Sequence, residues 1–333
     1  MNKLLKRVNT TYLLFFMMIF TLVSCGKKQK ETPEVNQMEQ KSEESTPFFK
    51  LSLAEWSLHR AIREDGMSPL DFAQKASELG FEGVEYVSQL YSEELKKDEN
   101  PAVAMQNLLK TLKEKSETYN VVNVLIMVDN EGHLADPDAE ERAKTVENHK
   151  KWVDAAKYLG CHSIRVNAHG EGSAEEVADA AVDGLTALST YAATQGINVL
   201  VENHGGYTSN GKWLTDVMAR VNMPNCGTLP DFGNFCMTEG YGSINSKECE
   251  DPYDIYMGVQ EMMEYAKAVS AKSYDFDENG EQPKIDYVKM LQIVKDAGYK
   301  GFIGVEYEGD NLSEIEGIKA TKKLLLTSAE KIK

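Results

Sequence analysis

One phrase recurs along the chain and constrains the fold more than any other feature. It consists of an amphipathic helix, a glycine, and a short run rich in β-branched residues. The glycine ends each helix because it adopts the left-handed cap conformation without steric cost. The apolar run that follows is typical of a strand buried on both faces. Clear copies of the phrase occupy residues 76–87, 155–166, 193–201 and 296–305.

Around these copies the sequence predicts strict alternation of strands and helices, which indicates a parallel sheet. Eight such units predict a closed (β/α)8 TIM barrel of the α/β class rather than an open sheet. No Gly-x-Gly-x-x-Gly follows the first strand, which argues against a dinucleotide-binding fold. The expected strands are 49–57, 82–88, 121–128, 163–168, 197–203, 226–231, 268–273 and 301–307. The expected helices are 68–80, 101–118, 138–159, 173–195, 211–221, 251–266, 284–298 and 313–330.

The N-terminal residues do not follow this pattern. Residues 1–24 combine a basic head with an apolar run at 12–23, which is shorter than the roughly 20 residues of a membrane span. The run ends just before Cys25 and resembles a bacterial lipoprotein signal, which implies a lipid anchor on Cys25 in the cell envelope. An ordinary secretory signal or an uncleaved anchor is the alternative. Residues 25–47 are polar and predict a flexible tether before a barrel at 48–333.

Charge and cysteine spacing exclude several kinds of partner. Lys and Arg total 36 against 53 Asp and Glu, a net charge of −17. Nucleic-acid binding needs clustered basic residues, so no nucleic-acid partner is expected. The cysteines after Cys25 form no Cys-x-x-Cys pair, which argues against a zinc ribbon. Cys236 and Cys249 are candidates for a disulfide in an oxidising compartment. The sequence does not indicate an oligomeric state.

Acidic residues lie at the ends of several predicted strands, where the chemistry of such barrels takes place. Glu202, Asp231 and Glu306 end apolar runs, and buried acids are costly unless they are paired or bound to metal. Their strands lie close together, so the three carboxylates should converge. They repel one another, and a divalent cation or Lys272 is therefore expected among them. Oxygen ligands favour Mg²⁺ or Mn²⁺ over zinc. The alternative is a structural network of ion pairs that closes the barrel.

Other side chains near the strand ends are candidates for contact with a substrate. His204 shares a strand face with Glu202, so it is either a catalytic or ligating group or an imidazole bonded to a neighbouring carboxylate. The long segment 233–252 predicts a loop that folds over the barrel mouth and shapes the substrate pocket. Arg165 is expected either to clamp a substrate oxygen or to pair with an acid inside the barrel. The expected substrate-binding residues are Glu85, Arg165, Asn167, His169, Asn234 and Trp56.

The order of the acidic strands around Glu202, Asp231 and Glu306 makes residues 49–331 resemble the sugar isomerase/epimerase family with a xylose-isomerase-like TIM barrel. The resemblance implies a divalent metal bound by a Glu, an Asp, a His and a Glu, with the two glutamates exchanging the substrate proton. Glu202 and Glu306 match those glutamates, and Asp231 matches the aspartate ligand.

Two positions depart from the family pattern. Its strand-7 histidine is Ser270 here, with Lys272 two residues on, and another of its histidines is Asn234. The losses argue against a multi-zinc endonuclease. They leave open whether the charge of Lys272 or a ligand from His204 replaces the missing histidine.

The resulting expectation is an envelope enzyme that isomerises or epimerises a non-phosphorylated keto or aldo sugar through an enediolate. Glu202 or Glu306 removes the proton beside the carbonyl and the other returns it, while Lys272, His204 or a cation assists. No glycine-rich phosphate cradle is visible, which argues against a sugar phosphate. The alternatives are a keto-sugar lyase, dehydratase or glycoside-cleaving enzyme on the same scaffold, and a non-catalytic sugar-binding lipoprotein.

Overall fold

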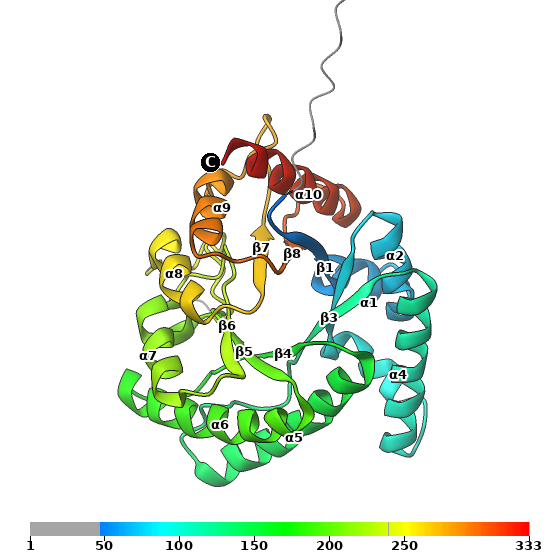
Figure 1. The fold of residues 1–333 in the computed structure, drawn as a ribbon, viewed down its shortest axis with the longest axis vertical. Coiled ribbons are helices and arrows are strands. Elements are labelled where there is room, and N and C mark those ends of the chain that lie inside the picture. The colour runs from blue at the N-terminus through cyan, green and yellow to red at the C-terminus, as the bar shows by residue number, and fades with distance from the viewer. Residues whose placement is uncertain (1–46, 239, 333) are drawn as a thin grey trace, which may run out of the picture. The chain divides into compact units, whose positions relative to one another are not determined.

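The computed structural model describes residues 47–238 and 240–332. The predicted signal peptide, Cys25 and nearly all of the predicted tether lie outside the described residues. The described chain forms a TIM barrel in which a ring of parallel strands is surrounded by helices (Figure 1). All eight predicted strands are confirmed. They are β1 Lys50–Ala54, β2 Gly83–Val87, β3 Val122–Met127, β4 Ser163–Val166, β5 Asn198–Glu202, β6 Cys226–Leu229, β7 Val269–Ser273 and β8 Phe302–Tyr307.

Every predicted helix is also present, and two short ones were not predicted. The unpredicted helices α1 and α3 have only five and four residues, too few to show a helical repeat of apolar positions. None of the helices in the described ranges is long and apolar enough to span a membrane. The helices are α1 His59–Arg63, α2 Phe72–Glu78, α3 Ser92–Leu95, α4 Pro101–Thr118, α5 Ala139–Leu159, α6 Ala174–Gln195, α7 Gly211–Val221, α8 Ile255–Met262, α9 Tyr287–Asp296 and α10 Glu314–Lys331.

The helix ends follow from local capping chemistry. Gly160 and Gly196 end α5 and α6 in the left-handed conformation, at φ of 82° and 73°, as the recurring phrase predicts. Ser173 begins α6 with a reciprocal capping box that includes Glu176. Helix α8 begins four residues later than predicted because the side chain of Asp254 caps its first turn.

The barrel closes unevenly. Regular parallel ladders join the strands in the order β6-β5-β4-β3-β2-β1-β8-β7. In the described chain β6 and β7 are joined only by two isolated bridges, one of them between Asp231 and Ser270. Strand β6 ends at Leu229 because Pro230 has no N–H to donate to a ladder. Two polar residues, Asp231 and Ser270, therefore lie at the junction between β6 and β7, where the backbone pairing of the ring is weakest.

Two apolar clusters support the barrel. The larger cluster lies between the sheet and the helices and contains most buried side chains. The smaller one includes Leu125, Met127 and Leu200. Leu200 shares a strand face with Glu202, so this cluster lies below the acidic strand ends inside the barrel. The predicted acids thus rest on an apolar floor, which strengthens every electrostatic interaction above it.

Candidate active site

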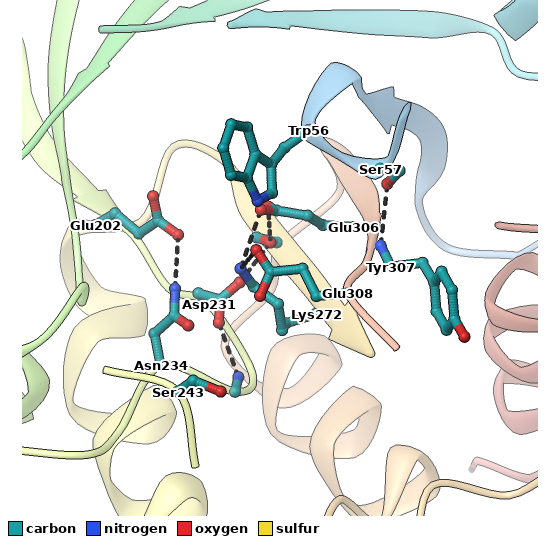
Figure 2. A network of polar contacts seen from close by, with 12 residues as sticks. Trp56, Ser57, Glu202, Asp231, Asn234, Ser243, Lys272, Glu306, Tyr307 and Glu308 are labelled. Atoms are coloured by element: carbon teal, nitrogen blue, oxygen red, sulfur yellow. Dashed lines mark hydrogen bonds and ion pairs between the residues drawn. The ribbon is translucent and has the colours of Figure 1, made fainter. Parts of the chain in front are cut away.

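Three carboxylates from three strands meet at one point. Glu202 is the last residue of β5, Asp231 follows β6, and Glu306 lies in β8. One oxygen from each lies within 4.8 Å of the others, and none of the three residues is more than 4% exposed. Figure 2 shows these side chains pointing toward a common space from opposite sides. The structure therefore brings together the three acids that the sequence singles out.

Strand β7 contributes a cation and a hydroxyl to this cluster. The ammonium of Lys272, 1% exposed, lies 3.0 Å from Glu306 Oε1 and 3.1 Å from Glu308 Oε1 (Figure 2). The Ser270 hydroxyl lies 2.6 Å from Asp231 Oδ2 and 3.2 Å from Glu306 Oε2. Since a hydroxyl has one proton, it donates to one carboxylate at a time. Ser270 thus links two acids at the position where the resemblance implies a histidine.

Arg165 joins this cluster from β4 and pairs with acids. Its Nη1 lies 2.7 Å from Asp129 Oδ1, and its Nε lies 2.8 Å from Glu202 Oε2. The second contact is a close ion pair whose angle does not satisfy a hydrogen bond. Asn167 also donates to Asp129 Oδ1, at 2.9 Å. Asp129 was not predicted, although it stands two residues beyond β3 and the strand-end rule used for the other acids would have found it.

Asn234 anchors the loop after β6 to the carboxylate site. Its side-chain amide donates to Glu202 Oε1 at 3.1 Å (Figure 2). Its backbone carbonyl accepts from Asn203 Nδ2 at 3.0 Å and from Ser209 Oγ at 2.8 Å. All four residues are buried. Asn234 therefore orients Glu202 and fixes the start of the loop at the same time.

Glu85 on β2 is a further buried acid inside the barrel. Its Oε1 accepts from the Ser52 hydroxyl at 2.6 Å, and Oε2 has no hydrogen-bond partner in the described chain. A Cβ added at Gly304 would lie only 2.5 Å from Glu85 Oε2. The carboxylate therefore occupies space that a side chain at position 304 on β8, beyond β1, would need.

The two predicted histidines lie to one side of the acids. The rings of His169 and His204 stack at 6.1 Å, and His204 also packs on Tyr241 at 5.6 Å. His169 Nε2 lies 2.8 Å from the His204 carbonyl, so it carries the proton and donates. Part of His204 is exposed, but its Nδ1 is sealed from solvent and has no hydrogen-bond partner in the described ranges.

Trp56 follows β1 at the mouth of the barrel. Its ring stacks on His59 with centroids 4.5 Å apart and an interplanar angle of 11°. In Figure 2 the indole points toward the Glu306 carboxylate. The residue is half-buried.

Burial dominates the titration of the acidic cluster. It raises the pKa of Asp231 and that of Glu85 to about 7 each. Burial also raises the pKa of Glu202, and the nearby Arg165 opposes that increase. Burial disfavours the charge of Lys272, but Glu306 and Glu308 outweigh it and hold the pKa of the ammonium well above its usual value. The acidic side chains at this site outnumber its two basic side chains, Arg165 and Lys272. Bound protons or a further cation must therefore balance the negative charge.

The donor set fits a hard divalent cation. Glu202, Asp231 and Glu306 each offer a carboxylate oxygen, these oxygens lie within 4.8 Å of one another, and the site carries excess buried negative charge. All three donors are oxygens, which favours Mg²⁺ or Mn²⁺ over zinc. Ser270 adds a neutral oxygen where an imidazole would favour a transition metal.

A cavity of about 400 Å³ lies beside the acids and does not include them. Its walls come from the ends of β4 and β5 and from the loop after β6, through His169, Gly205, Tyr207, Met237 and Thr238 among others. The predicted loop 233–252 therefore shapes a cavity at the barrel mouth. The predicted disulfide between Cys236 and Cys249 is also present and closes this loop.

Comparisons with known proteins agree with this fold. The 3-keto-D-glucoside 4-epimerase of E. coli superposes with a TM-score of 0.63 at 14% identity, covering 84% of this chain and 99% of that one. The IolI protein with a bound zinc atom superposes with a TM-score of 0.62 at 17% identity, covering 86% and 99%. At these identities the likeness shows the fold alone.

A curated relative matches over a shorter stretch. The 3'-dehydrocarminate deglycosidase alpha subunit of a Microbacterium species is 42% identical over 48 residues, which is 14% of each chain. The chain thus spans a small part of that relative's length. A family model described as xylose isomerase-like TIM barrel matches residues 73–328, and the chain therefore belongs to the xylose isomerase-like TIM barrel family.

Proposed function

We propose that the protein is an enzyme that transfers a proton at the carbon beside the carbonyl of a non-phosphorylated sugar. One observation carries this proposal: Glu202 and Glu306 face the same small space with oxygens within 4.8 Å. Each glutamate has its own cation, since Arg165 lies beside Glu202 and Lys272 beside Glu306. Two carboxylates in this arrangement suit removal of a proton by one and its return by the other, which isomerises or epimerises the sugar.

The surrounding residues give these groups distinct roles. Burial raises the pKa of Glu202, and Arg165 opposes this by favouring the ionised form, which is the form that accepts a proton. The Lys272 ammonium stays protonated and stabilises negative charge that develops on the carbonyl oxygen. A divalent cation, when bound by Glu202, Asp231 and Glu306, supplies Lewis-acid stabilisation of the same oxygen. The apolar floor below excludes water and strengthens these effects.

A second candidate reaction is elimination of a group attached to the same keto sugar. The name of one relative favours it, because that protein is a deglycosidase for a 3'-dehydro compound. The carboxylate takes the same proton, a carbon–carbon double bond forms, and the carbon–oxygen bond to the leaving group breaks. The leaving oxygen takes a proton from an acid, so the products are an alcohol and an unsaturated keto sugar.

Carboxamide variants test the shared proton transfer. We expect Glu202→Gln and Glu306→Gln each to lower turnover of a 3-dehydroglucoside at least about 1000-fold, since loss of a positioned acid or base costs this order. The exposed Glu278→Gln variant is the control and should retain full rate. Thermal melting should show that all variants are folded. Full activity in both buried variants contradicts the proposal, and absence of turnover in the wild type across keto sugars favours a binding protein.

Product analysis by NMR and mass spectrometry separates the two reactions. An isomerase or epimerase gives products of unchanged mass, whereas elimination releases an alcohol and leaves a product with a new vinylic proton. Either result identifies the reaction, because the two reactions share the carboxylate step and differ in their products.

We also propose that the enzyme is an exported lipoprotein anchored through Cys25. The signal-like sequence before Cys25 supports this, as does the disulfide, because disulfides persist in oxidising compartments. A Cys25→Ala variant should move from the membrane fraction to the soluble fraction. Unchanged fractionation would contradict the anchor.

A further inference from the structure

We propose that the 400 Å³ cavity beside the acids binds the group attached to the sugar, so that the substrate is a glycoside and not a free sugar. The bound group is a neutral, ring-sized alcohol joined through oxygen, either a second sugar or an aryl alcohol. The inference rests on the proposed function, because it takes the sugar itself to lie at Glu202, Asp231 and Glu306.

The position of the cavity supports binding of the sugar at the acids and of its attached group in the cavity. Gly205 lies in its wall and stands three residues beyond Glu202, so their Cα atoms are at most about 10 Å apart. Asn234 bonds Glu202 and also begins the loop that supplies Met237 and Thr238 to the opposite wall. A substituent of a sugar held at Glu202 therefore has the cavity within reach.

The chemistry of the described wall residues favours a neutral ligand. Of the described residues, none that lines the cavity is an Asp, Glu, Lys or Arg. Burial lowers the pKa of His169, and its Nε2 proton is already donated to the His204 carbonyl. Among these described residues, a phosphate, carboxylate or ammonium would therefore find no side chain of opposite formal charge. Tyr207 and Met237 instead offer apolar surface, which suits the faces of a ring.

The backbone of the wall leaves room for a ring. Gly205 and Gly206 have φ of 94° and 55°, which turn the chain away from β5 without placing a side chain in the opening. Gly206 is exposed, and a Cβ added there would contact nothing within 4 Å, so only its left-handed backbone restricts a side chain at this position. The volume of about 400 Å³ lies within the range of small-molecule sites.

Cavity-filling variants test the inference through binding, which does not require turnover. Met237→Trp and Gly206→Asn place larger side chains in the wall, and asparagine is chosen because it tolerates the left-handed conformation. The controls are Met257→Trp, at an exposed methionine on α8, and Gly298→Asn, at a glycine with φ of 77° outside the cavity wall. The probes are 4-nitrophenyl β-D-glucoside, cellobiose and glucose; the last two open to an aldehyde, so NMR after each titration checks that they have not reacted.

We expect calorimetry on the full chain to show that at least one glycoside binds more tightly than glucose. Each cavity variant should raise the Kd of that glycoside about tenfold and change the Kd of glucose less than about twofold. The controls should match the wild type. Preference for the nitrophenyl compound identifies an aryl alcohol as the group, and preference for cellobiose identifies a second sugar.

Equal binding of glycosides and glucose, or glycoside binding that is unaffected by both cavity variants, overturns the inference. Failure of the proposed function gives a different result, since Glu202→Gln and Glu306→Gln would then leave catalysis unchanged while the effects of the cavity variants on binding remain.

Discussion

Lys272 is the residue whose surroundings say most about the site. A fully buried ammonium is costly, yet this one lies about 3 Å from Glu306 and Glu308. The sequence suggested Lys272 as a charge among the acids, and the structure places it in contact with them. Its second partner Glu308, and the link that Ser270 makes between Asp231 and Glu306, depend on side-chain directions that strand periodicity does not fix.

Removing the charge of Lys272 should therefore destabilise the fold. We expect Lys272→Met to lower the free energy of unfolding by about 3–5 kcal/mol at pH 8, because it leaves buried carboxylates without their cation. The loss should be smaller near pH 5, where more of the acids are protonated. Urea unfolding measures both, with the exposed Lys110→Met as control. A Lys272→Met variant as stable as the wild type at pH 8 would contradict this account.

At the scale of elements, the strands and long helices were predictable because glycine caps and apolar runs mark them locally. The uneven closure between β6 and β7 was not predictable, because it depends on which segments meet after the ring has formed. The candidate site, too, was predictable only in part. Acids at strand ends could be read from the sequence, whereas the pairing of Arg165 with Asp129 required the positions of β3 and β4 in space.

The loop 233–252 gives a prediction at this scale. Its disulfide links Cys236 to Cys249, 13 residues apart, and holds the segment that lines the cavity. We expect reduction, or Cys249→Ser, to speed proteolytic cleavage within 237–248 while leaving the circular dichroism of the barrel unchanged. Such a cross-link stabilises the folded state by about 3 kcal/mol, because it reduces the conformational entropy of the unfolded loop.

Limited proteolysis with mass spectrometry follows the cleavage. Reductant added to the Cys249→Ser variant is the matched control and should have no further effect. Cleavage rates that do not depend on the disulfide would show that other contacts hold the loop.

For the molecule as a whole, buried acids make stability depend on pH. Burial raises the pKa of Glu55 to about 8 and the pKa values of Glu85 and Asp231 to about 7. Their ordinary values are 4.5 for Glu and 3.8 for Asp, so between these limits the folded state binds more protons than the unfolded state. Stability must therefore fall as pH rises through this window.

We expect the metal-free protein to be most stable near pH 5 and to lose stability progressively up to about pH 8. Denaturant unfolding in the presence of a chelator measures the slope. Glu55→Gln should reduce this slope, because it removes one of the buried carboxyl groups that titrate. Glu55 accepts hydrogen bonds from the Val87 amide and the Tyr91 hydroxyl, away from the three converging acids. A metal-free protein with equal stability at both pH values would contradict the burial argument. Mn²⁺ should restore stability at pH 8 by acting on Asp231 but not on Glu55.

The close approach of Glu85 to Gly304 has a consequence for how the sequence can change. The two residues lie on strands on either side of β1, and a side chain at 304 would require the Glu85 carboxylate to shift. Homologues that carry a β-substituted residue at 304 should carry a shorter residue at 85. Substitutions at these positions are therefore expected to arise as pairs, which an alignment of descendants would record as covariation between residues 219 places apart.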